Sequence, residues 1–559
     1  MRCPGDQGSE SEQTGENLHG RQNGFSFASA QAIYERTALS PPYPLSINFF
    51  YMKRPLLLLL LSPALLQAKL KLPVIFSDGA VLQQETGAKV WGWSDAGAAI
   101  TASFDGKNLT TKAAPDGSWS VTFPGLKANA TGQELKVSNG KENVLVKDVL
   151  VGEVWLASGQ SNMEWRVSNS DGAKEEVASA KDPLLRVFVS ANVATATPQN
   201  DWSGSWNRTQ PDKTGNFTAV GYYFGKRIRE EVGVPVGIIE CAWGGKPVEA
   251  FISESAMKAL PEAKGLIEKK AKAIAAWNPE AANANFEKQK AAYRTKLEAW
   301  KKDKKGRQPR GPRKPEDPAV NSSMHSTIFN GMIAPIAGYG ARGAIWYQGE
   351  SNANHGSANE YEELLGCMIK DWRTRWGSDL GFYFVQLANF RQPTTKPGIE
   401  DDWVVVQDEM RLALKSIPHS GMAIINDIGA ANDIHPRNKK DVGGRLARWA
   451  LAKNYGKTGH VISGPLYSGA EKKDNTMVIS FEHGQGLKAR NGGPLKRFEI
   501  AGEDGSWQWA QAKLQDGKVI VWHDQIKTPT KVRYAWASNP EGANLVNKAG
   551  LPASCFTTE

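Results

Sequence analysis

The chain has little cysteine for its length: its 559 residues include only four, Cys3, Cys241, Cys367 and Cys555. Four widely separated cysteines cannot supply a disulfide framework, and the last three have no histidine or cysteine partner at metal-ligand spacing. The sequence also lacks an HExxH pattern and clustered His/Cys spacing. A metal enzyme is therefore the least favoured class of enzyme, and we expect no metal site and no cofactor.

Nucleic-acid signals are missing as well, although the net charge is +10. Much of the positive excess lies in KKDKKGRQPRGPRK at 301–314, which holds eight basic residues and one acidic residue. Such a run is typical of a solvated loop or helix end. Without zinc-finger spacing, an RNA-binding signature or an interleaved aromatic platform, no nucleic-acid partner is expected.

The most apolar stretch is too short to span a bilayer comfortably, which takes about 20 residues. It lies in MKRPLLLLLLSPALLQA, where Lys53 and Arg54 precede an uninterrupted leucine block and Ala68 stands directly before Lys69. This pattern predicts a secretory signal peptide at 52–68, with an uncleaved anchor as the alternative. Residues 1–51 are then interpreted as an upstream gene-model extension. The mature protein is expected to be exported, periplasmic or extracellular, without stable membrane insertion.

What is present is an ordinary globular composition, with 40% hydrophobic and 23% charged residues. Period-two patterning broken by turn residues predicts a β-sandwich-like domain at 69–148 and another at 456–559. Between them, at 149–455, buried strands alternate with amphipathic helices, which is typical of an α/β domain with a parallel sheet. An Ala/Lys/Glu-rich and then Pro/Arg-rich stretch at 254–318 is interpreted as helices followed by a linker, inserted into that domain.

Polar residues follow four predicted strands of the α/β domain. They are GQSNME at 159–164, WGGKP at 243–247, WYQGESN at 346–352 and NDIHP at 432–436. In open α/β sheets, reactive groups gather in the loops that leave the carboxyl ends of the strands. A serine in a sharp turn after a strand, as at Ser161, suits a nucleophile whose amide also donates to an oxyanion. Taken singly, each motif also fits an ordinary turn.

The eight histidines narrow the choice of a base. Only His435 combines a strand-exit loop with an adjacent carboxylate that can fix its tautomer.

Taken in order, GQSNM, WGG, WYQGESN and DIHP resemble the sialate O-acetylesterase family of carbohydrate esterases, within the SGNH-hydrolase superfamily. The likeness also covers LPVIFSDGAVLQQ, FNGMIAPI and GLPASCF, from about Leu72 to the C-terminus. It implies a flavodoxin-like sheet and an acetylated carbohydrate as the substrate.

The resemblance also implies roles for single residues. Ser161 would attack the acetyl carbonyl, and His435 would take the hydroxyl proton. The oxyanion would be held by the Ser161 amide, by Gly244 or Gly245, and by the Gln348 side chain. Possible substrate contacts are Gln160, Asn162, Glu350 and Asn352.

The triad acid is left open. Many members of the superfamily place it three residues before the histidine, where this chain has Asn432. Asp433 is the first choice, Asp427 and Glu350 are reserves, and a Ser–His dyad remains an alternative.

The most favoured activity is that of a serine esterase acting as a sialate 9-O-acetylesterase. Deacetylation of acetylxylan or another glycan is the nearest alternative, because the motifs do not select the sugar. A non-catalytic carbohydrate-binding protein is the rival from another class. The oligomeric state stays open.

Overall fold

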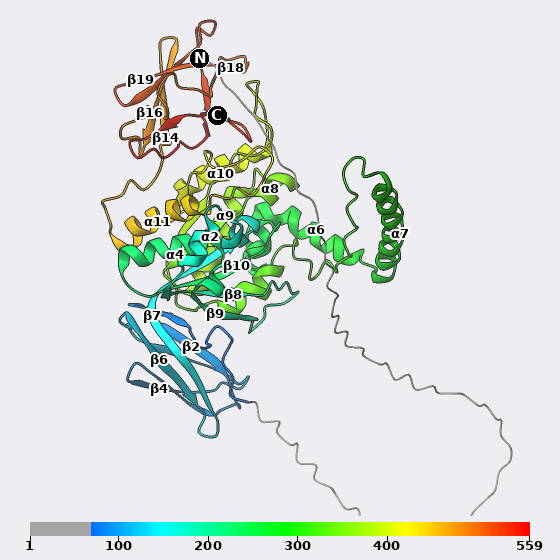
Figure 1. The fold of residues 1–559 in the computed structure, drawn as a ribbon, viewed down its shortest axis with the longest axis vertical. Coiled ribbons are helices and arrows are strands. Elements are labelled where there is room, and N and C mark those ends of the chain that lie inside the picture. Colours follow the sequence, from blue (N-terminus) through cyan, green and yellow to red (C-terminus); the bar gives the residue numbers. More distant parts are fainter. Residues whose placement is uncertain (1–68) are drawn as a thin grey trace, which may run out of the picture. The chain divides into compact units, whose positions relative to one another are not determined.

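The computed structural model describes residues 69–559 (Figure 1). The predicted signal peptide and upstream extension lie outside the described residues. Within them, no helix has the length and apolar character needed to cross a membrane.

The centre of the fold is a sheet in the order β13-β12-β11-β7-β10-β8-β9. All neighbouring pairs are parallel except β8 and β9. When β8 and β9 at one edge are left aside, the remaining strands β7, β10, β11, β12 and β13, counted along the chain, stand in the order 2-1-3-4-5, one of the common doubly wound arrangements. The bounds are β7 Asn143–Gly159, β8 Asp182–Ser190, β9 Gly204–Thr209, β10 Val236–Ala242, β11 Gly343–Tyr347, β12 Gly381–Val385 and β13 Ser420–Ala423. The predicted α/β fold with a largely parallel sheet is confirmed.

Helices cover both faces of this sheet (Figure 1). On one face, Trp155 of β7 contacts Phe224 and forms a 3.0 Å hydrogen bond with Tyr455 Oη. On the other, Trp346 of β11 contacts Phe251 and Trp372. The bounds are α1 Ser161–Glu164, α2 Ala173–Ser179, α3 Pro211–Thr214, α4 Ala219–Val232, α8 Glu350–His355, α9 Tyr361–Trp376, α10 Asp402–Ser416 and α11 Lys439–Tyr455. The large aromatic side chains at the centre therefore serve the core rather than the surface.

Strand β7 is 17 residues long and runs through the predicted domain boundary at 148. Its first half pairs with β1 and β6, and its second half pairs with β10 and β11. The strands before it are β1 Val81–Gln83, β2 Ala88–Trp93, β3 Ala99–Phe104, β4 Lys107–Lys112, β5 Ser118–Phe123 and β6 Asn129–Ser138. One hydrophobic core consequently runs from these strands into the α/β layer.

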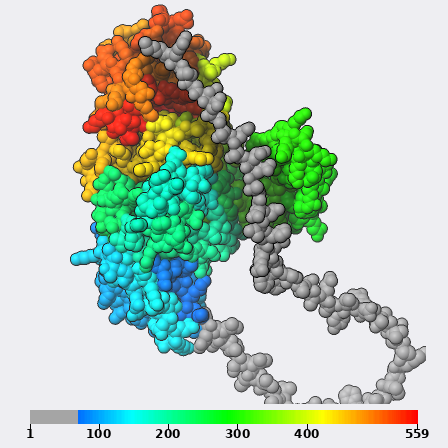
Figure 2. Space-filling model, in the orientation of Figure 1, coloured from blue at the N-terminus to red at the C-terminus, as the bar shows by residue number. Residues whose placement is uncertain are grey.

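The insertion begins with helices, α5 Glu254–Ala259, α6 Lys264–Ala275 and α7 Pro279–Asp303, and residues 304–317 that follow form neither helix nor strand. Helix α7 has 25 residues and buries none of its side chains. In Figure 2 this segment is the green surface at the side of the view. Because α7 packs no residue fully into the core, its sequence does not need the apolar stripe of the core helices.

The last part of the chain forms antiparallel sheets around a second core. One sheet has the order β14-β15-β20-β19 and another β18-β17-β21-β23, and β16 pairs with β22. The bounds are β14 Leu466–Lys473, β15 Thr476–Glu482, β16 Lys488–Ala489, β17 Phe498–Ala501, β18 Gln508–Trp509, β19 Gln511–Gln515, β20 Lys518–Trp522, β21 Lys531–Tyr534, β22 Leu545–Val546 and β23 Phe556–Thr557. Cys241, Cys367 and Cys555 are free thiols.

Candidate active site

Ser161 lies at the start of α1, directly beyond the carboxyl end of β7. The turn depends on Gly159, whose φ is +135°. A β-carbon there would lie 2.2 Å from the carbonyl oxygen of Tyr347, so only glycine fits. Because the first N–H groups of a helix have no acceptor within it, the Ser161 amide is suited to receive a negative oxygen.

His435 meets Ser161 across 274 residues of sequence: Nε2 lies 2.8 Å from the serine Oγ. The imidazole stacks on Trp165, with ring centroids 5.1 Å apart and planes 19° apart. Burial lowers the pKa of His435, the Lys439 charge lowers it further, and Asp433 opposes both. The imidazole is therefore neutral near pH 7 and can accept a proton from the hydroxyl.

Asp433 is the carboxylate in contact with His435. Its Oδ1 accepts a 2.9 Å hydrogen bond from the His435 backbone amide and lies 3.8 Å from the ring Nδ1. The second distance is too long for a hydrogen bond. Asn432 is turned elsewhere, since its Oδ1 accepts from Gln392 Nε2 at 3.0 Å.

The two reserve carboxylates have other partners. Asp427 accepts hydrogen bonds from Arg445 at 2.7 and 3.0 Å and from Arg490 at 2.9 Å. Glu350 is buried and accepts a 2.6 Å hydrogen bond from Asn162 Nδ2. No hydrogen bond or ion pair joins Asp427 or Glu350 to the His435 ring. Asp433 is therefore the better placed of the three candidate acids.

The expected oxyanion donors differ in their distance from Ser161 and in the protein oxygens to which they already donate. Gly244 is adjacent to the nucleophile, since a β-carbon there would lie 3.2 Å from Ser161 Cβ. However, its amide donates a 2.7 Å hydrogen bond to Glu164 Oε2. Gly245 is exposed and has a φ of +69°. The Gln348 side chain is fully buried, and its Nε2 donates to three protein oxygens, of Gln160, Lys246 and Asn352.

The four expected substrate contacts lie inside the protein. Gln160, Asn162, Glu350 and Asn352 are all at most 3% exposed. Each is hydrogen bonded to protein atoms. These placements favour support of the loops over direct contact with a sugar.

Sequence reasoning missed three residues at this site: Glu164, Trp165 and Lys439. Glu164 and Trp165 follow Ser161 by three and four residues, the spacing that brings side chains together on one helical turn. Lys439 follows His435 by four residues and is completely buried. These spacings were available in the sequence, but the contacts they make were not.

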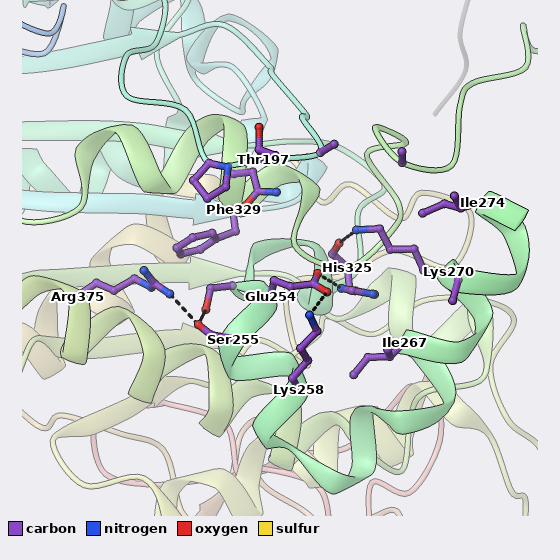
Figure 3. Close-up of a pocket in the computed structure, with 16 residues that line it drawn as sticks. Thr197, Glu254, Ser255, Lys258, Ile267, Lys270, Ile274, His325, Phe329 and Arg375 are labelled. Atoms are coloured by element: carbon purple, nitrogen blue, oxygen red, sulfur yellow. Dashed lines mark hydrogen bonds and ion pairs between the residues drawn. The ribbon is translucent and has the colours of Figure 1, made fainter. Parts of the chain in front are cut away.

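A separate cavity of about 700 Å³ lies between α6 and the segment around His325 (Figure 3). His325 Nδ1 lies 3.1 Å from Ser326 Oγ and 3.4 Å from Glu254 Oε2, so both neighbours meet one ring nitrogen, whereas in a catalytic triad the serine and the acid contact different nitrogens. Ser326 is also completely buried, and burial lowers the pKa of His325 to about 4. The nearby Lys270 ammonium donates to the His325 carbonyl oxygen. These contacts are typical of a structural cluster in which the polar side chains are paired with one another.

Among residues 69–559, no group of three or more His, Cys, Asp or Glu side chains is arranged to hold a metal ion.

Comparison with known proteins gives consistent similarities. The family described as "Carbohydrate esterase, sialic acid-specific acetylesterase" matches residues 151–307 and 320–451. Sialate O-acetylesterase of Rattus norvegicus is 27% identical over 527 residues, which cover 85% of this chain and 92% of the rat protein. The Homo sapiens protein of the same name is 24% identical over 503 residues, covering 83% and 87%. The crystal structure of a carbohydrate acetylesterase from Xanthomonas citri is 35% identical, with a TM-score of 0.73, and covers 88% of this chain and 100% of that chain.

Proposed function

The chain belongs to the sialic acid-specific acetylesterase family of carbohydrate esterases and is a carboxylic ester hydrolase; we propose that Ser161 is its nucleophile and His435 its general base. The observation that carries this assignment is the 2.8 Å contact between Ser161 Oγ and His435 Nε2 at the carboxyl edge of the sheet. The reaction of this hydrolase is the removal of O-acetyl groups from a carbohydrate.

The proposed reaction has two halves. Ser161 Oγ attacks the acetyl carbonyl carbon while its proton passes to His435 Nε2, and the carbonyl oxygen becomes an oxyanion. Collapse of this intermediate breaks the ester bond, and the departing sugar oxygen takes the proton from Nε2. Water then attacks the acetyl-enzyme and gives its proton to His435. Acetate leaves, and Ser161 recovers its hydrogen.

Asp433 is proposed as the acid that orients His435, acting across 3.8 Å and through the backbone of the same loop. The proposed oxyanion donors are the Ser161 amide and the amides of Gly244 and Gly245. Gly244 becomes available once Glu164 turns away. Gln348 is proposed to act indirectly: its hydrogen bonds hold Gln160 and Lys246 in place beside the site.

The proposed substrate is an O-acetylated sialic acid, as the names of the rat and human relatives indicate for those proteins. The position of Lys246, two residues beyond Gly244, supports an acidic sugar. Its ammonium lies 5.2 Å from the centroid of the Trp243 ring. Burial lowers the pKa of Lys246. Among the charges of the insertion, Glu316 raises this pKa and Arg313 lowers it. Acetylxylan, or another acetylated glycan, is the second candidate.

We also propose the finer architecture: a flavodoxin-like SGNH domain at 149–455, flanked by β-sandwich-like domains at 69–148 and 456–559. The sheet order 2-1-3-4-5 supports the first part. Export is proposed from the apolar segment at 52–68.

The test is hydrolysis of p-nitrophenyl acetate, 9-O-acetylated sialic acid and acetylxylan by the full chain, by Ser161→Ala and by Ser168→Ala. Ser168 is exposed and serves as the matched serine control. Ser161→Ala should lose turnover and labelling by an organophosphonate while keeping its melting temperature. Of 9-O-acetylated sialic acid and acetylxylan, the substrate with the higher kcat/KM identifies the carbohydrate. Turnover by Ser161→Ala would contradict the assignment, and so would a full-length chain that hydrolyses none of the three esters.

A further inference from the structure

Lys439 is a lysine in an unfavourable place. It is the first residue of α11 and its side chain is 0% exposed. A helix N-terminus carries partial positive charge, which favours anions over an ammonium group. Desolvation is a further cost. Burial lowers the pKa of Lys439 to about 7, although Glu350 and Asp433 act in the opposite direction. A side chain kept at such cost calls for a compensating role.

The Lys439 ammonium donates a hydrogen bond to Asn162 Oδ1. It also faces the rings of Trp165 and Tyr347, at 5.6 and 5.3 Å from their centroids. The other end of the Asn162 amide donates to Glu350 Oε1 at 2.6 Å. The amide thus lies between a cation and a carboxylate, and each charge strengthens the hydrogen bond on its own side.

The same amide joins the two reacting residues. Asn162 follows Ser161 directly, and its Nδ2 also donates to the carbonyl oxygen of Ile434 at 3.0 Å. Ile434 precedes His435 directly. One side chain therefore fixes the turn that carries the hydroxyl against the loop that carries the imidazole. Trp165 adds a second link, because it stacks on His435 and also lies beside the Lys439 ammonium.

We propose that Lys439 is a positioning residue of the hydrolase: through Asn162 it holds the Ser161 turn against the His435 loop, and its ammonium shares the Trp165 ring with the imidazole. This inference rests on the proposed function, because it assigns Lys439 to the same reaction. Lys439 acts on Ser161 and His435 and does not itself touch the ester.

The charges that face His435 act in opposite directions. Burial lowers the pKa of His435, and Lys439 lowers it further, whereas Asp433 raises it. Glu350 and Asp433 are the charged groups that act on Lys439. Below pH 7 the ammonium is mostly charged, so its influence is present in the range where an imidazole titrates. When the Lys439 charge is removed, burial alone opposes Asp433, so the pKa of His435 should rise.

The experiment is the pH profile of kcat/KM for p-nitrophenyl acetate with Lys439→Met in the full chain. We expect kcat to fall by about tenfold or more, as for a small misplacement of reacting groups, with little change in KM. We also expect the acid limb of the profile to move to higher pH. Lys440→Met is the matched control, because Lys440 is the exposed neighbour on the same helix. Its kcat and acid limb should stay at the wild-type values.

A second variant covers the case in which Lys439→Met does not fold, since that change leaves the Glu350 carboxylate buried without its cation. Lys439→Met with Glu350→Gln removes both charges and should fold. It should show the same shift of the acid limb, because Glu350 is not one of the charges acting on His435.

A lower activity without movement of the acid limb, or wild-type kinetics, would overturn the proposal for Lys439. Ser161→Ala separates this failure from failure of the esterase assignment. If Ser161→Ala is inactive while Lys439→Met is unchanged, only the role of Lys439 is lost. If Ser161→Ala is active, the assignment of the nucleophile itself is lost.

Discussion

Glu164 accepts a 2.7 Å hydrogen bond through its Oε2 from the backbone amide of Gly244, next to the Ser161 side chain. Its other oxygen accepts from Asn192 Nδ2 at 3.0 Å. A carboxylate therefore accepts the hydrogen bond of the Gly244 amide, which is one of the proposed oxyanion donors. In the proposed reaction, the Glu164 carboxylate would therefore lie close to the oxyanion that forms when Ser161 attacks the ester.

The first prediction concerns this competition. Glu164→Ala frees the Gly244 amide and removes the charge, so kcat for p-nitrophenyl acetate should rise by about threefold or more, within the range that one oxyanion donor supplies. Glu164→Gln is the control for shape. Its amide oxygen still accepts from Gly244 but without charge assistance, so a smaller rise is expected. A fall in kcat with Glu164→Ala would instead show that the carboxylate assists the reaction.

The second prediction concerns Asp433. Asp433→Asn keeps an oxygen for the His435 amide but removes the charge that raises the imidazole pKa. The acid limb of kcat/KM should move to lower pH, opposite to the movement expected for Lys439→Met. Because Asp433 lies 3.8 Å from Nδ1, kcat should fall by only about tenfold, compared with about 10⁴-fold for a hydrogen-bonded triad acid. Movement of the limb to higher pH would contradict the electrostatic argument.

The third prediction concerns stability. Burial raises the pKa of Asp427, but hydrogen bonds and charges from Arg445 and Arg490 outweigh burial and lower the pKa below its usual value. Such a carboxylate stabilises the fold above about pH 4, and this contribution is lost as the pH falls toward the lowered pKa. Asp427→Asn should reduce the free energy of unfolding at pH 7 by about 2 kcal/mol, because the partly buried Arg445 and the exposed Arg490 lose the carboxylate that accepts their hydrogen bonds.

Thermal or urea unfolding measures this loss, and the difference from wild type should shrink at low pH. Asp516→Asn is the control, because Asp516 is exposed in the turn between β19 and β20 and asparagine tolerates its φ of +50°. If Asp427 were instead the triad acid, Asp427→Asn would lower kcat of the folded enzyme strongly. Unchanged kcat in the folded variant is expected.

The elements of the α/β layer could be predicted from sequence because each has a strong local pattern. The apolar run that ends at Gly159 corresponds to β7, and the amphipathic pattern at 221–233 corresponds to α4, Ala219–Val232. Helix α10 was not predicted. It packs against both α9 and the C-terminal β region, with Val404 in the second core, so apolar residues on more than one side obscure its period.

By itself, the sequence determined that polar turns follow buried parallel strands, and that Ser161 and His435 are the outstanding residues in those turns. This follows from local physics: buried strands need continuous apolar runs, and sharp turns need glycine. Only the tertiary structure decided that β7 is shared between two sheet regions, that Glu164 occupies the Gly244 amide, and that Lys439 reaches Asn162. These contacts join loops that are distant in sequence, and their distances depend on strand order and loop conformation, which no local pattern encodes.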